Sequence, residues 1–93
     1  MRYLRVLWKH EFPDEPIAFY SELDDDRWEK RKVVQFKDGH YGYASAEGES
    51  GYGLALIALP EMEEFRQDPQ YEAAEIGAAA FEVVWRKAHE KHR

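Results

Sequence analysis

The pair Asp38-Gly39 stands between two runs rich in β-branched and aromatic residues, and it constrains the fold more than any other feature of the sequence. A two-residue type I′ turn needs a positive φ at both positions, which Asp and Gly tolerate well. The pair therefore predicts a hairpin in which Phe36 lies opposite Tyr41. Further from the turn, the same register places Val34 opposite Tyr43. We expect these four side chains to form a ladder on the core face of a sheet.

Three β-rich runs lead up to this turn, at residues 2–12, 17–23 and 27–36, and one follows it. The first alternates apolar and polar side chains, as a half-buried strand does. Residues 54–59 form a short apolar run that is either a last strand or an extended lead into a helix. The sequence therefore predicts an antiparallel meander of four strands, or of five if this run pairs.

The apolar period changes from that of a strand to that of a helix after Pro60. Residues 60–67 predict one short helix, with a proline at its start and acids in its first turn. Residues 75–93 predict a long C-terminal helix, because its apolar residues recur at i, i+3, i+4 and i+7. That stripe comprises Phe81, Val84, Trp85 and Ala88. We therefore expect residues 1–93 to form a single α+β domain, with the long helix packed on one face of the sheet.

Composition narrows the class of protein. The chain has 93 residues, of which 44% are hydrophobic and 15% aromatic, enough for one packed core. It has no cysteine, which excludes disulfides and thiolate metal sites. No run approaches the length of a membrane span, and the net charge of −6 disfavours binding to nucleic acid. We expect a soluble cytoplasmic protein that binds neither membrane nor nucleic acid.

Three consecutive aspartates, Asp24, Asp25 and Asp26, invite three interpretations. They could be metal ligands, a surface for a basic partner, or the tip of a hairpin. A calcium loop needs spaced ligands and a glycine turn, and that pattern is absent. Aspartate is a preferred turn residue, so we expect a solvated hairpin tip. We predict no metal and no other cofactor.

Catalytic motifs are missing from the sequence. There is no Gly-x-Ser-x-Gly elbow, phosphate loop or His-Glu-x-x-His motif, and so we predict a protein that is not an enzyme. The alternative is a small enzyme or ligand-binding domain. Its site would lie near His10, Glu11, Asp14 and Arg31, between sheet and helix.

Negative charge is concentrated in two places, around the turns that join the first three predicted strands and between residues 47 and 75. Most such acids belong to a solvated face, but an anionic surface can also dock on a basic protein. We predict a partner-binding surface that includes Trp28 as an aromatic anchor. Its residues would be Asp14, Glu15, Glu22, Asp24, Asp25, Asp26 and Trp28.

Two long segments, residues 5–44 and 68–85, resemble a family of small, uncharacterised bacterial single-domain proteins. The cues are Trp8, His10, residues 13–16, Glu22, Glu29, residues 31–33, Asp38-Gly39, Phe81 and Trp85. The resemblance implies no activity, so no catalytic residue can be transferred. The format is similar to that of immunity proteins, which neutralise toxins of inter-bacterial competition. This analogy predicts that the protein occludes the active site of a basic toxin domain. The sequence leaves open whether it is a monomer or a homodimer.

Overall fold

The chain is built around one antiparallel sheet. The computed structural model describes residues 1–50, 53–54 and 58–90. Six strands of the described chain form the sheet, in the order β5-β4-β3-β2-β1-β6. The strands are β1 (Arg2–Trp8), β2 (Ala18–Leu23), β3 (Glu29–Gln35), β4 (Tyr41–Ser45), β5 (Gly48–Ser50) and β6 (Tyr71–Ile76). The helices are α1 (Met62–Arg66) and α2 (Ala78–His89).

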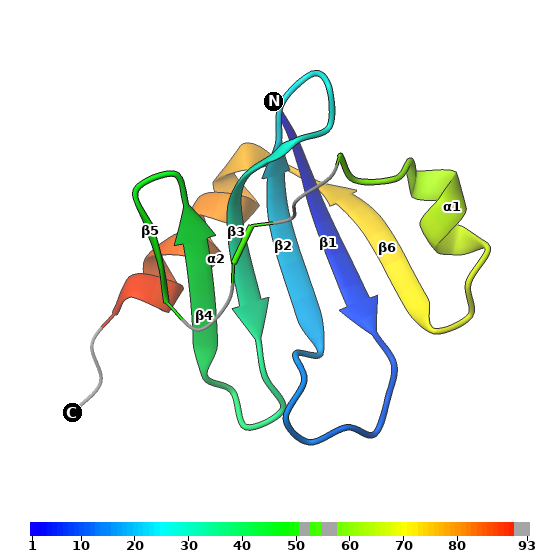
Figure 1. Cartoon of the computed structure of the whole chain (residues 1–93), viewed down its shortest axis with the longest axis horizontal. Helices are drawn as coiled ribbons and strands as arrows, with labels where there is room; N and C mark the ends of the chain where they lie inside the picture. The colour runs from blue at the N-terminus through cyan, green and yellow to red at the C-terminus, as the bar shows by residue number, and fades with distance from the viewer. Residues whose placement is uncertain (51–52, 55–57, 91–93) are drawn as a thin grey trace.

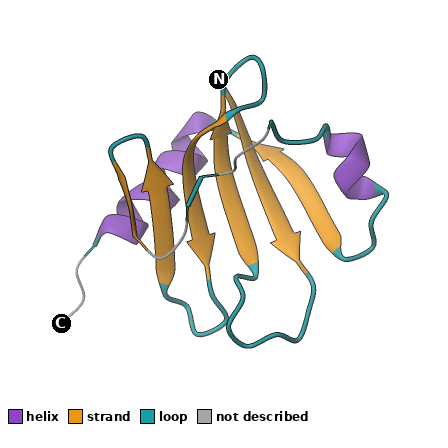
Figure 2. Cartoon of the chain, in the orientation of Figure 1, coloured by secondary structure: helices purple, strands orange, loops and turns teal. Residues whose placement is uncertain are grey.

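The predicted α+β class is confirmed. Strands β1 to β4 are consecutive antiparallel neighbours, as a meander requires. Figure 1 shows α2 packed behind the sheet and α1 beside β6. Figure 2 shows the same arrangement with helices and strands in different colours. The predicted stripe of α2 faces the sheet, where Phe81 is fully buried and the ring of Trp85 lies 5.8 Å from that of Tyr43.

The short strand β5 was not predicted, and neither was strand β6. The alanines of β6 favour a helix, and the long helix was expected to begin at Glu75. Instead Tyr71–Ile76 pairs with β1 along its whole length, and α2 begins after Gly77. Pairing satisfies the backbone groups that the outer edge of β1 would otherwise expose, and this tertiary gain outweighs local propensity.

The turn at Asp38-Gly39 is one residue longer than predicted. The amide of Gly39 donates to the carbonyl of Phe36 (2.9 Å), and the amide of Phe36 donates to the carbonyl of His40 (2.9 Å). The loop therefore comprises residues 37–39, with Gly39 at a φ of 95°. This is the three-residue hairpin in which a type I turn is followed by a left-handed glycine.

The predicted ladder is wrong as a consequence. Val33 lies opposite Tyr43, and Val34 lies opposite Gly42. Because side chains alternate, a shift of one residue moves Val34 to the face opposite Tyr43. Val33 and Val34 are both fully buried, since the sheet is covered on both sides at this point.

The two faces of the sheet differ in what covers them. On one face α2 packs through Phe81 and Trp85, and the ring of Phe81 lies 5.3 Å from that of Tyr3. On the other face α1 and the residues before it cover the sheet. The predicted short helix at 60–67 is found there as α1. The candidate strand at 54–59 includes residues 55–57, which lie outside the described part of the chain. No helix in that described part has the length and apolar character needed to cross a bilayer.

Candidate functional site

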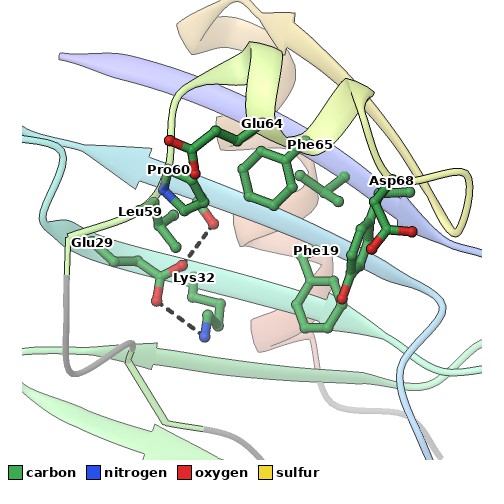
Figure 3. A pocket seen from close by; sticks show the side chains of 11 residues that line it. Phe19, Glu29, Lys32, Leu59, Pro60, Glu64, Phe65 and Asp68 are labelled. Carbon is green, nitrogen blue, oxygen red and sulfur yellow. Dashed lines mark hydrogen bonds and ion pairs between the residues drawn. The ribbon is translucent and has the colours of Figure 1, made fainter.

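A hollow with apolar walls lies between α1 and the sheet face opposite α2. It has a volume of about 400 Å³. Its walls are apolar and come from elements far apart in sequence. They are Val6 on β1, Phe19 on β2, Leu59 and Pro60 before α1, and Phe65 on α1. Figure 3 shows Phe65 reaching down from α1 toward the sheet, where Phe19 lies. We call this hollow the sheet–α1 cavity.

Three polar side chains form the floor of the sheet–α1 cavity. The ammonium Nζ of Lys32 lies 3.0 Å from Oε1 of Glu29. The hydroxyl of Ser21 donates to Oε2 of the same carboxylate at 2.6 Å. The Glu29 side chain is 1% exposed and that of Lys32 is 9% exposed. We call this group the floor cluster, and it places a buried ion pair beneath the apolar walls of the cavity (Figure 3).

An irregularity in β3 brings the floor cluster together. In a regular strand, residues 29 and 32 face opposite sides, because side chains alternate. The register shifts by one residue between the pairs Glu22–Arg31 and Leu23–Glu29, so Lys30 is an extra residue on β3. Such a bulge re-aims a side chain, and here it turns Glu29 to the face that carries Lys32.

The outer wall of the cavity is tied to the loop that joins β2 and β3. Arg27 adopts a φ of 67°, which is rare for a residue with a side chain. Its guanidinium donates to the carbonyls of Leu59 (3.0 Å) and Pro60 (2.5 Å), and it forms an ion pair with Glu61 at 3.4 Å. The backbone amide of Leu59 donates in turn to the Arg27 carbonyl at 2.9 Å. These bonds hold the segment before α1 against the sheet.

The mouth of the cavity is acidic. Glu64 on α1 and Asp68 after it both line the opening (Figure 3). Tyr71 closes one side, and its ring packs edge-on against Phe65 at 5.9 Å. The Oδ1 atom of Asp68 accepts a hydrogen bond from the amide of Gln70 at 2.9 Å, which fixes the turn into β6. The cavity can therefore offer apolar contact, a buried charged floor and an anionic entrance.

Residues 2–90 match the model of a protein family described as a domain of unknown function (DUF6881). The chain belongs to this family. No curated protein and no solved structure matches it. The matched range covers the described sheet and both described helices. The family description assigns no role to the residues of the sheet–α1 cavity.

The aspartate run lies at a hairpin tip, residues 24–28, as predicted. Oδ1 of Asp24 accepts hydrogen bonds from the amides of Asp26 and Trp28, both at 2.9 Å. These bonds, that from Trp28 above all, lower the pKa of Asp24. Asp25 and Asp26 are exposed, and Trp28 is 44% exposed. Across the described residues, no three His, Asp or Glu side chains gather where they could hold a metal ion.

The other predicted partner-binding residues do not join this tip. Glu22 is buried beneath α2, where Arg31 binds both of its carboxylate oxygens at 2.8 Å. The bonds from Arg31 lower the pKa of Glu22. Asp14 and Glu15 are exposed in the loop between β1 and β2, which Figure 1 shows at the opposite end of the sheet. The acids therefore do not form one continuous surface.

The alternative site around His10 is not assembled either. Nε2 of His10 lies 2.8 Å from the carbonyl of Pro16, and Nδ1 accepts the amide hydrogen of Phe12 at 2.9 Å. A carbonyl can only accept, so Nε2 carries the ring hydrogen and His10 serves to close its own loop. Glu11 and Asp14 are exposed in this loop. Arg31 lies toward the other end of the sheet.

Sequence reasoning missed the floor cluster. One signal was available in the sequence. Lys32 lies two residues before Val34 in the predicted strand, and so it shares a face with a predicted core residue. A lysine in that position is rarely buried unless it is paired. The partner could not be found in this way, since Glu29 reaches the same face only through the bulge.

Proposed function

We propose that this protein is a non-enzymatic binding domain whose ligand is a small molecule held in the sheet–α1 cavity. The floor cluster carries this proposal. A buried ion pair contributes little net stability, because the desolvation of two charges offsets their attraction. An apolar floor would stabilise the fold at least as well. Pockets for small molecules, in contrast, combine apolar walls with a few fixed polar groups, as this cavity does.

The chemistry of the floor cluster favours binding over catalysis. Ser21 donates its hydrogen to the Glu29 carboxylate, whose charge Lys32 balances. Both oxygens of the carboxylate are engaged in these contacts, which hold the hydroxyl and the ammonium in place. The cluster is instead a rigid set of donors and acceptors that can orient a ligand.

A fragment screen followed by amide chemical shifts tests this proposal. We expect fragments to move the amide signals of residues that line the cavity, such as Phe19, Ser21 and Phe65. Glu64→Arg places a long side chain at the mouth and should weaken binding. Glu63→Arg makes the same change on the adjacent residue of α1, which does not line this cavity, and should not. A screen in which fragments move only residues elsewhere would contradict the proposal.

A second candidate function rests on the hairpin tip. Trp28 is 44% exposed, and it is flanked by the exposed Asp25 and Asp26. Tryptophan is enriched among residues that dominate binding energy at protein interfaces. This candidate is a bacterial cytoplasmic protein of immunity type that docks on a basic toxin domain and occludes its active site. The negative net charge would speed that encounter.

Binding to the protein encoded by the neighbouring gene tests the second candidate. Trp28→Ala should weaken the complex by about tenfold or more, as the loss of a central anchor does. Phe12→Ala is the matched control, because Phe12 is 58% exposed but lies in the loop at the other end of the sheet. Equal effects of the two substitutions, or no complex at low salt, would rule this candidate out.

A further inference from the structure

The charges of the residues that line the sheet–α1 cavity are unbalanced, while Arg27 in the outer wall is paired with Glu61. Three carboxylates line the cavity, those of Glu29, Glu64 and Asp68, against the single ammonium of Lys32. Lys32 is engaged with Glu29 and also donates to the carbonyl of Gly53 at 3.0 Å. Glu64 and Asp68 therefore dominate the field at the entrance. That field favours a ligand with positive charge and opposes an anion.

Aromatic rings face the same space as these carboxylates. Phe19 lies on the sheet side, Phe65 on the helix side, and Tyr71 beside Phe65. In Figure 3 Asp68 lies to one side of the space between the rings of Phe65 and Phe19, and Glu64 lies on the side of α1. Aromatic faces attract cations, most strongly when water is excluded. Apolar rings and nearby carboxylates together are suited to an organic cation.

We propose that the ligand is a small organic cation, an amine or quaternary ammonium attached to an apolar or aromatic body. The body would lie between Phe19 and Phe65, above the floor cluster. The cationic group would lie near the mouth, within the field of Glu64 and Asp68. This inference rests on the proposed function, because it assigns a ligand class to the same cavity.

Three probes of similar shape and different charge test the ligand class. They are phenethylammonium, the neutral 2-phenylethanol and the anionic 3-phenylpropionate, each titrated to millimolar concentration against the whole chain. Amide chemical shifts report both the affinity and the residues that respond. We expect phenethylammonium to bind about tenfold more tightly than phenylpropionate at low salt, with a smaller difference at high salt.

Charge-neutral variants of the mouth separate charge from shape. The double variant Glu64→Gln/Asp68→Asn keeps the size of both side chains, and the amide oxygen that it introduces at position 68 can still accept the bond from Gln70. It should reduce the preference for the cation about fivefold or more. Glu63→Gln is the matched control on the same helix and should leave the preference unchanged.

The outcomes distinguish this inference from the function on which it rests. If the alcohol or the anion binds in the cavity as tightly as the cation, the ligand class is wrong and the binding site stands. The class is also wrong if the double variant keeps the full preference. If no probe and no library fragment moves the signals of cavity residues, both the class and the proposed function fall.

Discussion

At the scale of single residues, the buried charges of the floor cluster should have the largest effect on the free energy of unfolding. Lys32→Met removes the ammonium that balances the buried charge of Glu29. We expect this variant to lose about 3 kcal/mol of unfolding free energy, as measured by urea denaturation. The double variant Glu29→Gln/Lys32→Met removes both charges and keeps an acceptor for Ser21, so it should recover more than half of the loss. A double variant as unstable as Lys32→Met would contradict this account.

The hairpin tip gives a second test at this scale, because its three aspartates have different roles. Only the Asp24 carboxylate accepts the amide bonds of Asp26 and Trp28. We expect Asp24→Ala to lower the melting temperature and Asp24→Asn to lower it much less, since Asn keeps the acceptor oxygen. Asp25→Ala should have no effect. Equal melting temperatures for all three variants would show that the tip does not depend on these bonds.

At the scale of elements, one arginine fastens α2 to the sheet. The guanidinium of Arg31 binds Glu22 on β2 and Glu82 on α2, and it lies 4.9 Å from the ring centroids of both Phe81 and Trp85. Hydrogen bonds from Arg31 are the main cause of the lowered pKa of Glu22 and of Glu82. Because these folded-state pKa values lie below the unfolded ones, the unfolded chain binds more protons in acid.

Stability should therefore fall as the pH falls. The contribution of this contact is complete above the unfolded pKa of glutamate, about 4.3, and is lost as the pH drops through the lower folded values. We expect urea unfolding of Glu82→Gln to depend less on pH than that of the native chain between about pH 5 and pH 3. Glu63→Gln, an exposed change on α1, should keep the native dependence. Identical slopes for the native chain and Glu82→Gln would contradict this assignment.

The elements also show how far sequence reasoning reaches. Alternation identified β1, β-rich composition identified β2 and β3, and the apolar period identified the sheet-facing stripe of α2. Strand β6 was not predicted because its alanines favour a helix, and because it pairs with β1, which lies about 70 residues earlier in the chain. The loop at residues 37–39 escaped because a glycine in a left-handed conformation fits both two- and three-residue hairpins. The one extra residue in the loop shifts the pairing of β3 with β4, and so it changes which side chains of β3 and β4 share a face.

At the scale of the whole molecule, the candidate site could not be predicted from the sequence because it too depends on contacts between distant segments. Its parts come from β1, β2, β3 and α1, and they meet only after the sheet is assembled. The bulge that turns Glu29 inward leaves no signature in a single sequence. The role of Arg27 could not be predicted from the sequence either. Its left-handed backbone and its bonds to Leu59 and Pro60 form only when the segment before α1 packs against the sheet.

The arrangement of the molecule separates its two candidate surfaces. The sheet–α1 cavity lies on one face of the sheet, while α2 and Arg31 occupy the other. Within the described residues, Arg27 links the hairpin tip to the cavity wall through its hydrogen bonds to Leu59 and Pro60. We therefore expect Trp28→Ala to leave fragment binding in the cavity unchanged, as followed by amide chemical shifts. A loss of fragment binding in this variant would mean that the tip and the cavity act as one site.

The most direct test of the central claim is a crystal structure of the protein with its tightest-binding fragment. We predict that the fragment lies between Phe19 and Phe65, in contact with the floor cluster of Ser21, Glu29 and Lys32. A fragment bound on the α2 side of the sheet or at the hairpin tip, with the cavity closed by Phe65, would contradict the account.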